Sequence, residues 1–406
     1  MSISVSADER VDGGVSRLQA LVLTDRELRE TLGRVPTPDA FVAVALSMAR
    51  DRGLTLEASA IASQLAPDPL GLSRLQAPRG IAPAAPQPGW LPVQAGHDGV
   101  DYAVDWAWFG EHQLTEPFFE AAVRRALSLP FNRLFGFRTP LADVVAWADA
   151  LPTIEPSGLI FHMSRCGSTL AAQMLAATPA HVVVSEASPL DRVVQIARED
   201  PGIDGPALVR AMIKVLGHAR DPSAERLFVK LDCWHTLAVP LFRRALPLTP
   251  FIFMYREPVE VMVSQMRQRG SQMVPEFVPP SLYGLELPGG VPAEDYCARV
   301  LAAVCEGVLS EPAQATTLVN YTEMPGALLD RILPCFGLTL DAETEAAMAA
   351  AARFNAKASG SDFTPDSEAK RREASDTVKA ATARWLSDPY ARLEARRAAQ
   401  ATPIPD

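Results

Sequence analysis

The segment GLIFHMSRCGSTLAAQMLAATP, which runs from Gly158 to Pro179, decides the fold class of this chain. It begins as an apolar, strand-like run, passes through a short loop with two small hydroxyl residues, and continues as a good helix former. Further strand-like runs alternate with helix-like stretches along the chain: HVVVS, RLFVKL, PFIFMYR and ATTLVNY. This alternation predicts an α/β fold with a parallel sheet flanked by helices.

The composition limits the class of partner and the compartment. The 406 residues are 48% hydrophobic, enough for one sizeable core and a small accessory domain. A net charge of −10 argues against a general nucleic-acid binder. The five cysteines show no CxxC spacing and leave one over in any disulfide pairing, so we expect free thiols and a cytoplasmic protein. We find neither a signal-peptide core at the N-terminus nor an apolar run that could span a membrane.

The chain divides by composition into four regions. Residues 1–66 are typical of short amphipathic helices, and residues 67–90, rich in Pro and Ala, of an extended linker. We expect residues 91–155 to form a connecting helical segment. Residues 156–406 contain the alternating strands and helices, so we expect the main α/β domain there.

The loop SRCGST, Ser164 to Thr169, has the context of a phosphate-binding loop. Gly167 permits close approach of the backbone to an anion, and the N–H groups at the start of the following helix point toward it. The loop is not a Walker A motif, because it lacks the first glycine and the lysine of G-x-x-x-x-G-K-S/T; its positive side chain is Arg165. An ordinary strand-to-helix turn with Ser/Thr capping is the alternative.

The segment FIFMYREPVEVMVSQMRQ, residues 251–268, supplies a second candidate anion site. A strand ends at Arg256, a helix starts directly afterwards, and Ser264 follows eight residues after the arginine. Both side chains could hold a phosphate, with the guanidinium as a bidentate donor. Alternatively, Arg256 pairs with Glu257 or Glu260 and Ser264 packs against its neighbours.

Together the two segments resemble the superfamily of sulfotransferases that use PAPS, 3′-phosphoadenylyl sulfate. That family carries a K/R-x-G-S/T-S/T loop for the 5′-phosphosulfate, matched here by Arg165 to Thr169. It also carries a later R-D/E/N/P-P-x-x-x-x-x-S element for the 3′-phosphate, matched by Arg256 to Ser264. The resemblance covers about residues 155–395, most closely the bacterial branch that is similar to the tyrosylprotein sulfotransferases, and implies a P-loop-type domain over residues 156–406.

The resemblance implies a donor site in two parts. The 5′-phosphosulfate would be bound by the loop residues Arg165, Cys166, Gly167, Ser168 and Thr169, and the 3′-phosphate by Arg256 and Ser264. Cys166 departs from the family, which often has serine there. We expect the loop backbone, rather than this thiol, to hold the phosphate, and we do not expect Cys166 to act as a nucleophile.

Two later segments are implied to lie near the donor. Tyr321, in TLVNYTEMP, resembles a Y-E-D/Q-L element that follows a late strand of the family. The family also folds a late, basic loop over the nucleotide, which makes Lys357, Ser359 and Lys370 candidates for such a lid. For Lys370 the alternative is a solvated helix face, and for Tyr321 a purely structural role.

The resemblance further implies the catalytic residues. Glu186 stands where the tyrosylprotein branch has its catalytic glutamate and would take the proton of the acceptor hydroxyl. Lys230, together with Arg165, would neutralise charge on the leaving oxygen. His235 is the second candidate base, since cytosolic small-molecule sulfotransferases use a histidine. The structural alternatives are a helix-capping Glu186, a surface Lys230 and a core His235.

The implied reaction is in-line transfer of a sulfuryl group from PAPS to a hydroxyl acceptor, leaving PAP, the 3′,5′-bisphosphate. We expect no metal, because the sequence has neither zinc-type His/Cys spacing nor a clear strand with a Mg²⁺ carboxylate. A P-loop kinase-like phosphotransferase and a non-catalytic scaffold that retains the PAPS-binding fold are the alternatives. The acceptor stays open among small molecules, carbohydrates, lipids and peptides, and residues 269–290 are a candidate acceptor loop.

Within residues 1–66, the segment TDRELRETLGRVPTPDAFVAVALSMARDRGLTLEASAIASQL resembles the Nif11-like domain. The similarity lies in its D-x-x-L/F, P-T/S-x-D/E-x-F/L and G-L/Y-x-L/F-T/E patterns. It implies a small all-helical N-terminal domain that binds a peptide or mediates homo-oligomer contact. A helical cap packed on the main domain is the alternative.

Overall fold

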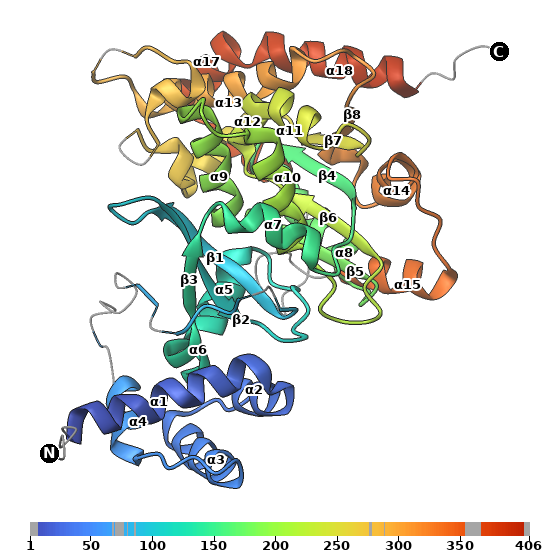
Figure 1. Cartoon of the computed structure of the whole chain (residues 1–406). Coiled ribbons are helices and arrows are strands. Elements are labelled where there is room, and N and C mark those ends of the chain that lie inside the picture. The colour runs from blue at the N-terminus through green and yellow to red at the C-terminus, as the bar shows by residue number, and fades with distance from the viewer. Residues whose placement is uncertain are drawn as a thin grey trace, which may run out of the picture.

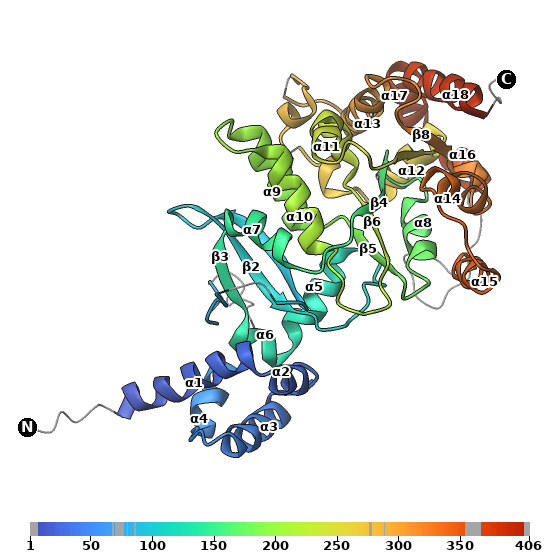
Figure 2. The ribbon, with the colours of Figure 1, turned by 45° about the vertical axis from the view of Figure 1, so that its right-hand side comes forward.

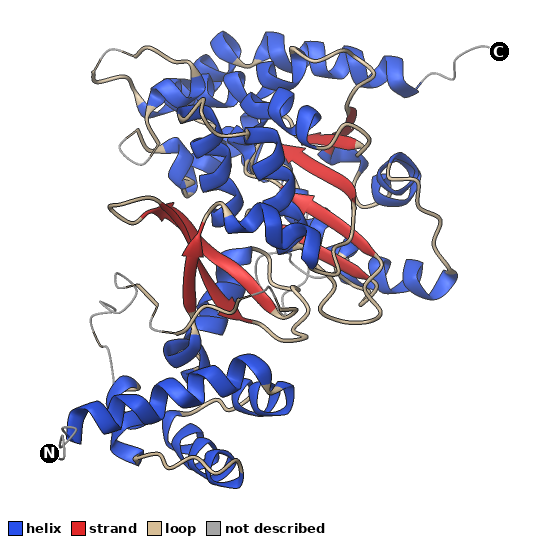
Figure 3. Cartoon of the chain, in the orientation of Figure 1, coloured by secondary structure: helices blue, strands red, loops and turns tan. Residues whose placement is uncertain are grey.

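The structure is a computed structural model, and it describes residues 7–66, 69, 77–78, 80–84, 87–275, 278–287, 289–353 and 367–401. Figure 1 shows three parts along the molecule: a group of N-terminal helices, a small antiparallel sheet, and a larger parallel sheet surrounded by helices. Figure 3 colours the strands of both sheets red against the blue helices. In the described part of the chain, no helix has both the length and the apolar character needed to cross a membrane.

The parallel sheet forms the centre of the main domain. Its strands are β4 (Pro156–His162), β5 (His181–Ser185), β6 (Arg226–Lys230), β7 (Phe251–Tyr255) and β8 (Thr317–Asn320). They lie in the order β5-β6-β4-β7-β8, and every pairing is parallel. The strands are almost entirely buried, which is why they appear in the sequence as continuous apolar runs. The expected α/β class and its five strands are therefore confirmed.

Helices cover the parallel sheet and extend beyond it. They are α8 (Ser168–Leu175), α9 (Ser188–Glu199), α10 (Gly205–Leu216), α11 (Val239–Ala245), α12 (Pro258–Arg267), α13 (Ala293–Leu309), α14 (Leu333–Cys335), α15 (Ala342–Ala351), α16 (Ser367–Glu373), α17 (Asp376–Trp385) and α18 (Ser387–Ala401). A 3-10 helix, η2 (Cys233–Ala238), follows β6 and packs against α13. The late helices α16 and α17 pack on α12, so the C-terminal part of the chain contacts the helix that follows β7.

Residues 91–155 correct one expectation, because they are not a helical connection. They contain the antiparallel strands β1 (Trp90–His97), β2 (Tyr102–Trp108) and β3 (Phe137–Pro140), and the helices α5 (Phe119–Ser128), α6 (Pro130–Phe135) and α7 (Asp143–Ala150). Aromatic and β-branched residues in β1 and β2 favour strands, and Gly99, with φ of 102°, permits the tight turn between them. Trp90 faces Trp108 across the pair, so the aromatic residues stabilise a hairpin.

The N-terminal residues are helical, as expected: α1 (Ala7–Thr24), α2 (Arg26–Gly33), α3 (Pro38–Asp51) and α4 (Ala58–Gln64). Figure 2 shows them at the far end of the molecule from the C-terminal helices. They pack on α6, where the Gln19 amide donates to the Leu134 carbonyl at 2.9 Å and Arg133 donates to the Leu65 carbonyl at 3.1 Å. Their likeness to a Nif11-like domain stays a prediction.

The parallel strands all end at one edge of the sheet. After β4 comes the loop that leads to α8, after β5 comes Glu186, and after β6 comes Asp232. After β7 comes Arg256, and after β8 comes Tyr321. In open α/β sheets ligands bind at this carboxyl edge. The sheet therefore gathers residues that are distant in the sequence at one face.

Candidate functional site

The loop between β4 and α8, our candidate anion cradle, has three residues with positive φ angles. Ser164 and Arg165 have φ angles of 73° and 51°, and Gly167 has a φ of 87°. Left-handed conformations cost a non-glycine residue about 1–2 kcal/mol, so two in succession indicate a functional constraint. The Ser164 backbone N–H donates to His162 Nδ1 at 3.0 Å, whereas the N–H groups at the start of α8 have no side-chain cap and could bind an anion.

A cavity of about 690 Å³ opens beside this loop. Arg165, Ser168 and Thr169 line it, together with Glu186 and Asp232 from the neighbouring strand ends. The expected acceptor loop, residues 269–290, contributes its first residues and Leu282 to the lining. The guanidinium of Arg165 donates to the Gln268 carbonyl at 2.5 Å, and burial lowers the pKa of Arg165.

Cys166 lies in the loop but faces the sheet. Its thiol is fully buried, donates to the Met254 carbonyl at 3.1 Å, and does not line the cavity. Burial raises the pKa of this thiol. The side chain is therefore part of the core beneath the loop and not a thiolate beside the cavity.

Lys230 and Glu186 form a buried ion pair at the ends of β6 and β5. The Lys230 ammonium donates a short hydrogen bond to the Glu186 carboxylate, and the Glu186 backbone N–H donates to the Lys230 carbonyl at 2.8 Å. Burial favours the neutral form of Glu186, but the Lys230 charge and a hydrogen bond from His162 outweigh it, so the pKa of Glu186 falls well below its usual value. Lys230 also lies 5.1 Å from the centre of the Phe118 ring.

His162, at the end of β4, ties the strand ends together and was not foreseen from the sequence. Its Nδ1 accepts the Ser164 backbone N–H at 3.0 Å, so Nε2 carries the proton. Nε2 donates to the Leu231 carbonyl at 2.8 Å and lies 3.2 Å from the Glu186 carboxylate. Burial lowers the pKa of His162, which agrees with a neutral ring. A buried histidine at the end of a strand run was the available signal.

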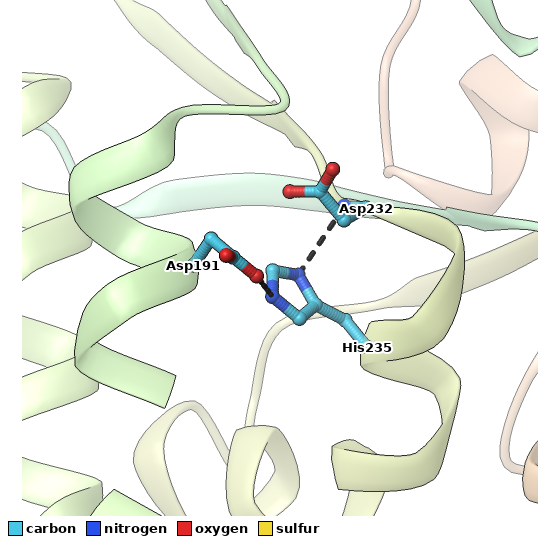
Figure 4. A group of neighbouring side chains, drawn as sticks. All are labelled: Asp191, Asp232 and His235. Carbon is cyan, nitrogen blue, oxygen red and sulfur yellow. Dashed lines mark hydrogen bonds and ion pairs between the residues drawn. The ribbon is translucent and has the colours of Figure 1, made fainter. Parts of the chain in front are cut away.

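Asp232, Asp191 and His235 form a second group at the cavity wall (Figure 4). Asp232 precedes η2, and its backbone N–H donates to His235 Nδ1 at 3.2 Å. The other ring nitrogen, Nε2, donates to the Asp191 carboxylate at 3.0 Å. Asp191 is on α9 and also accepts a hydrogen bond from Gln195 at 2.8 Å. His235 is 1% exposed and does not line the cavity.

The same three side chains offer oxygen and nitrogen atoms within 4.8 Å of one another, a spacing that could suit a metal ion. A metal would need a ring lone pair from His235. Its Nδ1 lone pair already accepts a backbone N–H, and its Nε2 carries a proton for Asp191. We therefore assign no metal ligand to this group, because both ring nitrogens of His235 are already engaged.

Arg256 begins the motif after β7 and Ser264 ends it within α12, and both contact Glu260. The Arg256 guanidinium forms an ion pair with the buried Glu260 carboxylate at 2.6 Å. The Ser264 hydroxyl donates to the Glu260 backbone carbonyl at 2.9 Å. This is the arrangement of the alternative in which arginine pairs with a neighbouring glutamate and serine bonds within its helix.

Tyr321 connects the two anion motifs. Its ring lies 4.0 Å from the Arg256 guanidinium carbon. A Cβ added at Gly167 would come within 2.6 Å of the same ring. The ring is therefore sandwiched between the loop after β4 and the arginine after β7. Tyr321, Arg256 and Ser264 do not belong to the cavity lining, so the Arg256 motif meets the loop at the Tyr321 ring and not across the cavity.

The C-terminal candidates are only partly described. Lys357 and Ser359 lie outside the described residues. Lys370 is buried in α16, so it is not on a solvated helix face. The same helix carries Arg371, which pairs with Glu260 at 2.8 Å, and begins at Ser367, which donates to that carboxylate at 2.9 Å. The late basic segment therefore packs on the Arg256 motif.

Comparison with known proteins gives distant likenesses. No family model matches the chain, and no curated protein matches it. Among solved structures, a sulfotransferase domain from the curacin biosynthetic pathway is 15% identical, with a TM-score of 0.35, over 57% of this chain and 98% of that one. Sulfotransferase STF1 from Mycobacterium tuberculosis H37Rv is 16% identical, with a TM-score of 0.37, over 66% and 84%. Sulfotransferase STF9 from Mycobacterium avium is 13% identical, with a TM-score of 0.37, over 59% and 78%.

These scores are too low to support an argument about activity, which must come from the site itself.

Proposed function

We propose that the chain is a PAPS-dependent sulfotransferase that moves a sulfuryl group to a hydroxyl acceptor by in-line displacement. One observation carries this proposal. The anion cradle after β4 and the Arg256 motif after β7 end neighbouring parallel strands, and Tyr321 packs against both. A nucleotide with phosphates at both its 5′ and 3′ positions needs two such anion sites side by side.

The loop residues suit the 5′-phosphosulfate. Backbone N–H groups around Gly167 and at the start of α8 supply donors, and Arg165 supplies positive charge. The hydroxyls of Ser168 and Thr169 line the cavity and are placed to donate as well. Cys166 would contribute its backbone alone, because its thiol faces the Met254 carbonyl.

Arg256 and Ser264 are our candidates for the 3′-phosphate. For this role the Ser264 hydroxyl must turn from the Glu260 carbonyl to the phosphate, and Arg256 must share its charge between the phosphate and Glu260. Tyr321 would contact the donor beside Arg256. Lys357, which lies outside the described residues, stays a donor-site candidate from the sequence.

Lys230 would stabilise the charge that builds on the bridging oxygen of the departing bisphosphate, with help from Arg165. Glu186 holds the Lys230 ammonium in place, and a carboxylate of the cavity takes the acceptor proton. The acceptor would be a small molecule, a carbohydrate or a peptide with a free hydroxyl. All five cysteines are free, which suits a reducing compartment, so we place the activity in the cytoplasm.

The test is calorimetric titration of PAP into the protein in the presence of EDTA, with AMP as the matched ligand that lacks the 3′-phosphate. Loss of one charge-assisted contact costs about 1.5–3 kcal/mol, so Arg256→Ala should weaken PAP binding about 10–100-fold. AMP binding should be weaker than PAP binding in the wild type and should change little in the variant. Arg210→Ala removes an exposed arginine paired with Glu155 and serves as the control.

PAP binding without metal that depends on Arg256 but not on Arg210 supports the donor site. Turnover of PAPS then separates an enzyme from a scaffold. Failure of PAP to bind, with ATP and Mg²⁺ bound instead, would overturn the proposal in favour of a phosphotransferase.

A further inference from the structure

Two carboxylates face the cavity from adjacent strand ends, and they differ in whether a charged side chain is paired with them. Glu186 follows β5, and Asp232 follows β6, two residues after Lys230. Both line the cavity beside Arg165 and the start of α8. Either could reach an acceptor hydroxyl held near the anion cradle, so their hydrogen bonds and ion pairs decide which one can accept a proton.

Glu186 is already committed to other groups. Its carboxylate accepts a hydrogen bond from the Lys230 ammonium and lies 3.2 Å from the protonated Nε2 of His162. These contacts stabilise the anion and hold the pKa of Glu186 well below its usual value. A carboxylate stabilised in this way is a weak base, because taking up a proton would leave Lys230 buried without its counter-ion.

Asp232 has no such partner. No side chain in the described ranges donates a hydrogen bond to its carboxylate, and none of their lysines or arginines forms an ion pair with it. Its position is nonetheless held firmly, because its backbone N–H donates to His235 and His235 in turn donates to Asp191 (Figure 4). The carboxylate accepts the backbone N–H of His235 in a capping box, which holds it in a fixed place on the cavity wall, and its remaining lone pairs have no side-chain donor among the described residues.

We propose that Asp232, and not Glu186, takes the proton from the acceptor hydroxyl. This inference rests on the proposed sulfotransferase function. As the acceptor oxygen forms its bond to sulfur, the hydroxyl proton passes to an Asp232 carboxylate oxygen. The bond from sulfur to the bridging oxygen breaks, and its electron pair leaves on the phosphate of PAP. Asp232 then releases the proton to solvent, which restores the carboxylate. No further reactant is needed.

His235 and Asp191 are positioning residues in this arrangement. Neither ring nitrogen of His235 has a lone pair free for an acceptor, since Nδ1 accepts the Asp232 N–H and Nε2 donates to Asp191. The imidazole, our second candidate base from the sequence, instead holds the backbone of Asp232 in place. Glu186, our first candidate, instead holds Lys230 toward the leaving group.

The surroundings of Asp232 also place its titration near neutral pH. The titratable or charged groups that act on it or respond to it come from β6, the end of β5, η2, α9 and the 3-10 helix η4 (Pro280–Tyr283): Lys230, Glu186, Cys233, His235, Asp191 and Tyr283. Burial, with the negative charges of Glu186 and Asp191, raises the pKa of Asp232 to about 7 against the influence of His235 and Lys230. Because the ionised form is the base, turnover should rise with pH through this region and then level off.

The first test follows the titration of Asp232 itself and needs no acceptor. In protein labelled with ¹³C at the aspartate carboxyls, the signal absent from Asp232→Asn identifies this residue. We expect its midpoint near neutral pH, and a lower midpoint in Glu186→Gln, which removes a neighbouring negative charge. A midpoint in the ordinary aspartate range, near about 4, would overturn the inference.

The second test measures PAP formation from PAPS with phenol and 4-nitrophenol as acceptor probes. We expect Asp232→Asn to lower kcat with phenol about 10²–10⁴-fold, to remove the rise with pH, and to leave PAP affinity unchanged. The loss should be smaller with 4-nitrophenol, which ionises more readily and depends less on a base. Glu186→Gln should keep the rise with pH.

The two proposals fail in different ways. Asp232→Asn with wild-type kcat and an unchanged pH profile would overturn the base assignment while PAP binding and turnover still supported the sulfotransferase. Absence of PAP binding in every variant would overturn the donor site, and the carboxyl titration would still report independently on Asp232.

Discussion

The buried pair of Lys230 and Glu186 should be strongly and unequally sensitive to substitution. The Lys230 side chain is 0% exposed, whereas that of Glu186 is 23% exposed at the cavity. Glu186→Gln leaves the buried ammonium without its counter-ion and should lower the free energy of unfolding by about 3 kcal/mol. In Lys230→Met the Glu186 carboxylate keeps its contact with His162 and some access to water. The free energy of unfolding should therefore fall by only about 1–2 kcal/mol.

The assay is urea unfolding at pH 7, followed by tryptophan fluorescence, for the two single variants and the double variant. Because the double variant buries no unpaired charge, it should be more stable than Glu186→Gln alone, with a coupling energy of about 1–3 kcal/mol. Lys214→Met is the control. Lys214 pairs with the exposed Glu155 at 3.4 Å, so its loss should cost less than about 1 kcal/mol.

The pH dependence follows from the lowered pKa of Glu186. A carboxylate whose pKa is lower in the folded state stabilises the fold above its unfolded pKa, about 4.3, and this stabilisation is lost as the pH falls. The stability difference between wild type and Lys230→Met should therefore shrink as the pH falls below about 4.3. Additive effects, or a larger cost for Lys230→Met than for Glu186→Gln, would refute the reasoning.

The loop after β4 leads to two further predictions. Gly167→Ala would place a Cβ 2.6 Å from the Tyr321 ring at a φ of 87°, so PAP affinity should fall at least about tenfold. The calorimetric control is Gly289→Ala, whose added Cβ would meet nothing within 4 Å. Equal PAP affinities for the two variants would contradict the cradle geometry. Cys166→Ser keeps a hydrogen-bond donor for the Met254 carbonyl, so PAPS turnover should stay close to wild type. Loss of PAPS turnover in this variant would indicate a chemical role for the thiol.

Local patterns in the sequence were sufficient to find the five parallel strands and the loop after the first of them. Each strand is a short, continuous apolar run with polar residues at its end, and the helix of the Arg256 motif begins directly after such a run. These features can be read locally, because the apolar run of a buried strand and the start of a helix each depend on residues within about ten positions in the sequence. The sequence did not predict the antiparallel hairpin at residues 90–108. Cross-strand pairing stabilises this hairpin, and that pairing cannot be recognised from the helix-like sequence around it.

The partners of the candidate residues could not be read in this way. Arg256 had two neighbouring glutamates as alternatives, and the structure selects Glu260, one helical turn away, with Arg371 from a distant helix on the same carboxylate. His162 was not a candidate at all, because its importance lies in three contacts that reach Ser164, Leu231 and Glu186. A histidine within an apolar run gives no sign of which strand ends lie beside it.

The sequence by itself determined the α/β class and the strands, and it supplied the two candidate anion motifs, because these follow from apolar periodicity, glycine and short spacing. Only the tertiary structure decided which carboxylate forms an ion pair with Lys230 and which one does not. Glu186 and Lys230 are 44 residues apart, and they meet because the parallel register sets Ser185 opposite Lys230. A shift of one residue would turn alternate side chains to the other face of the sheet. Register and packing therefore distinguish Glu186, which pairs with Lys230, from Asp232, whose carboxylate forms no ion pair with a described lysine or arginine.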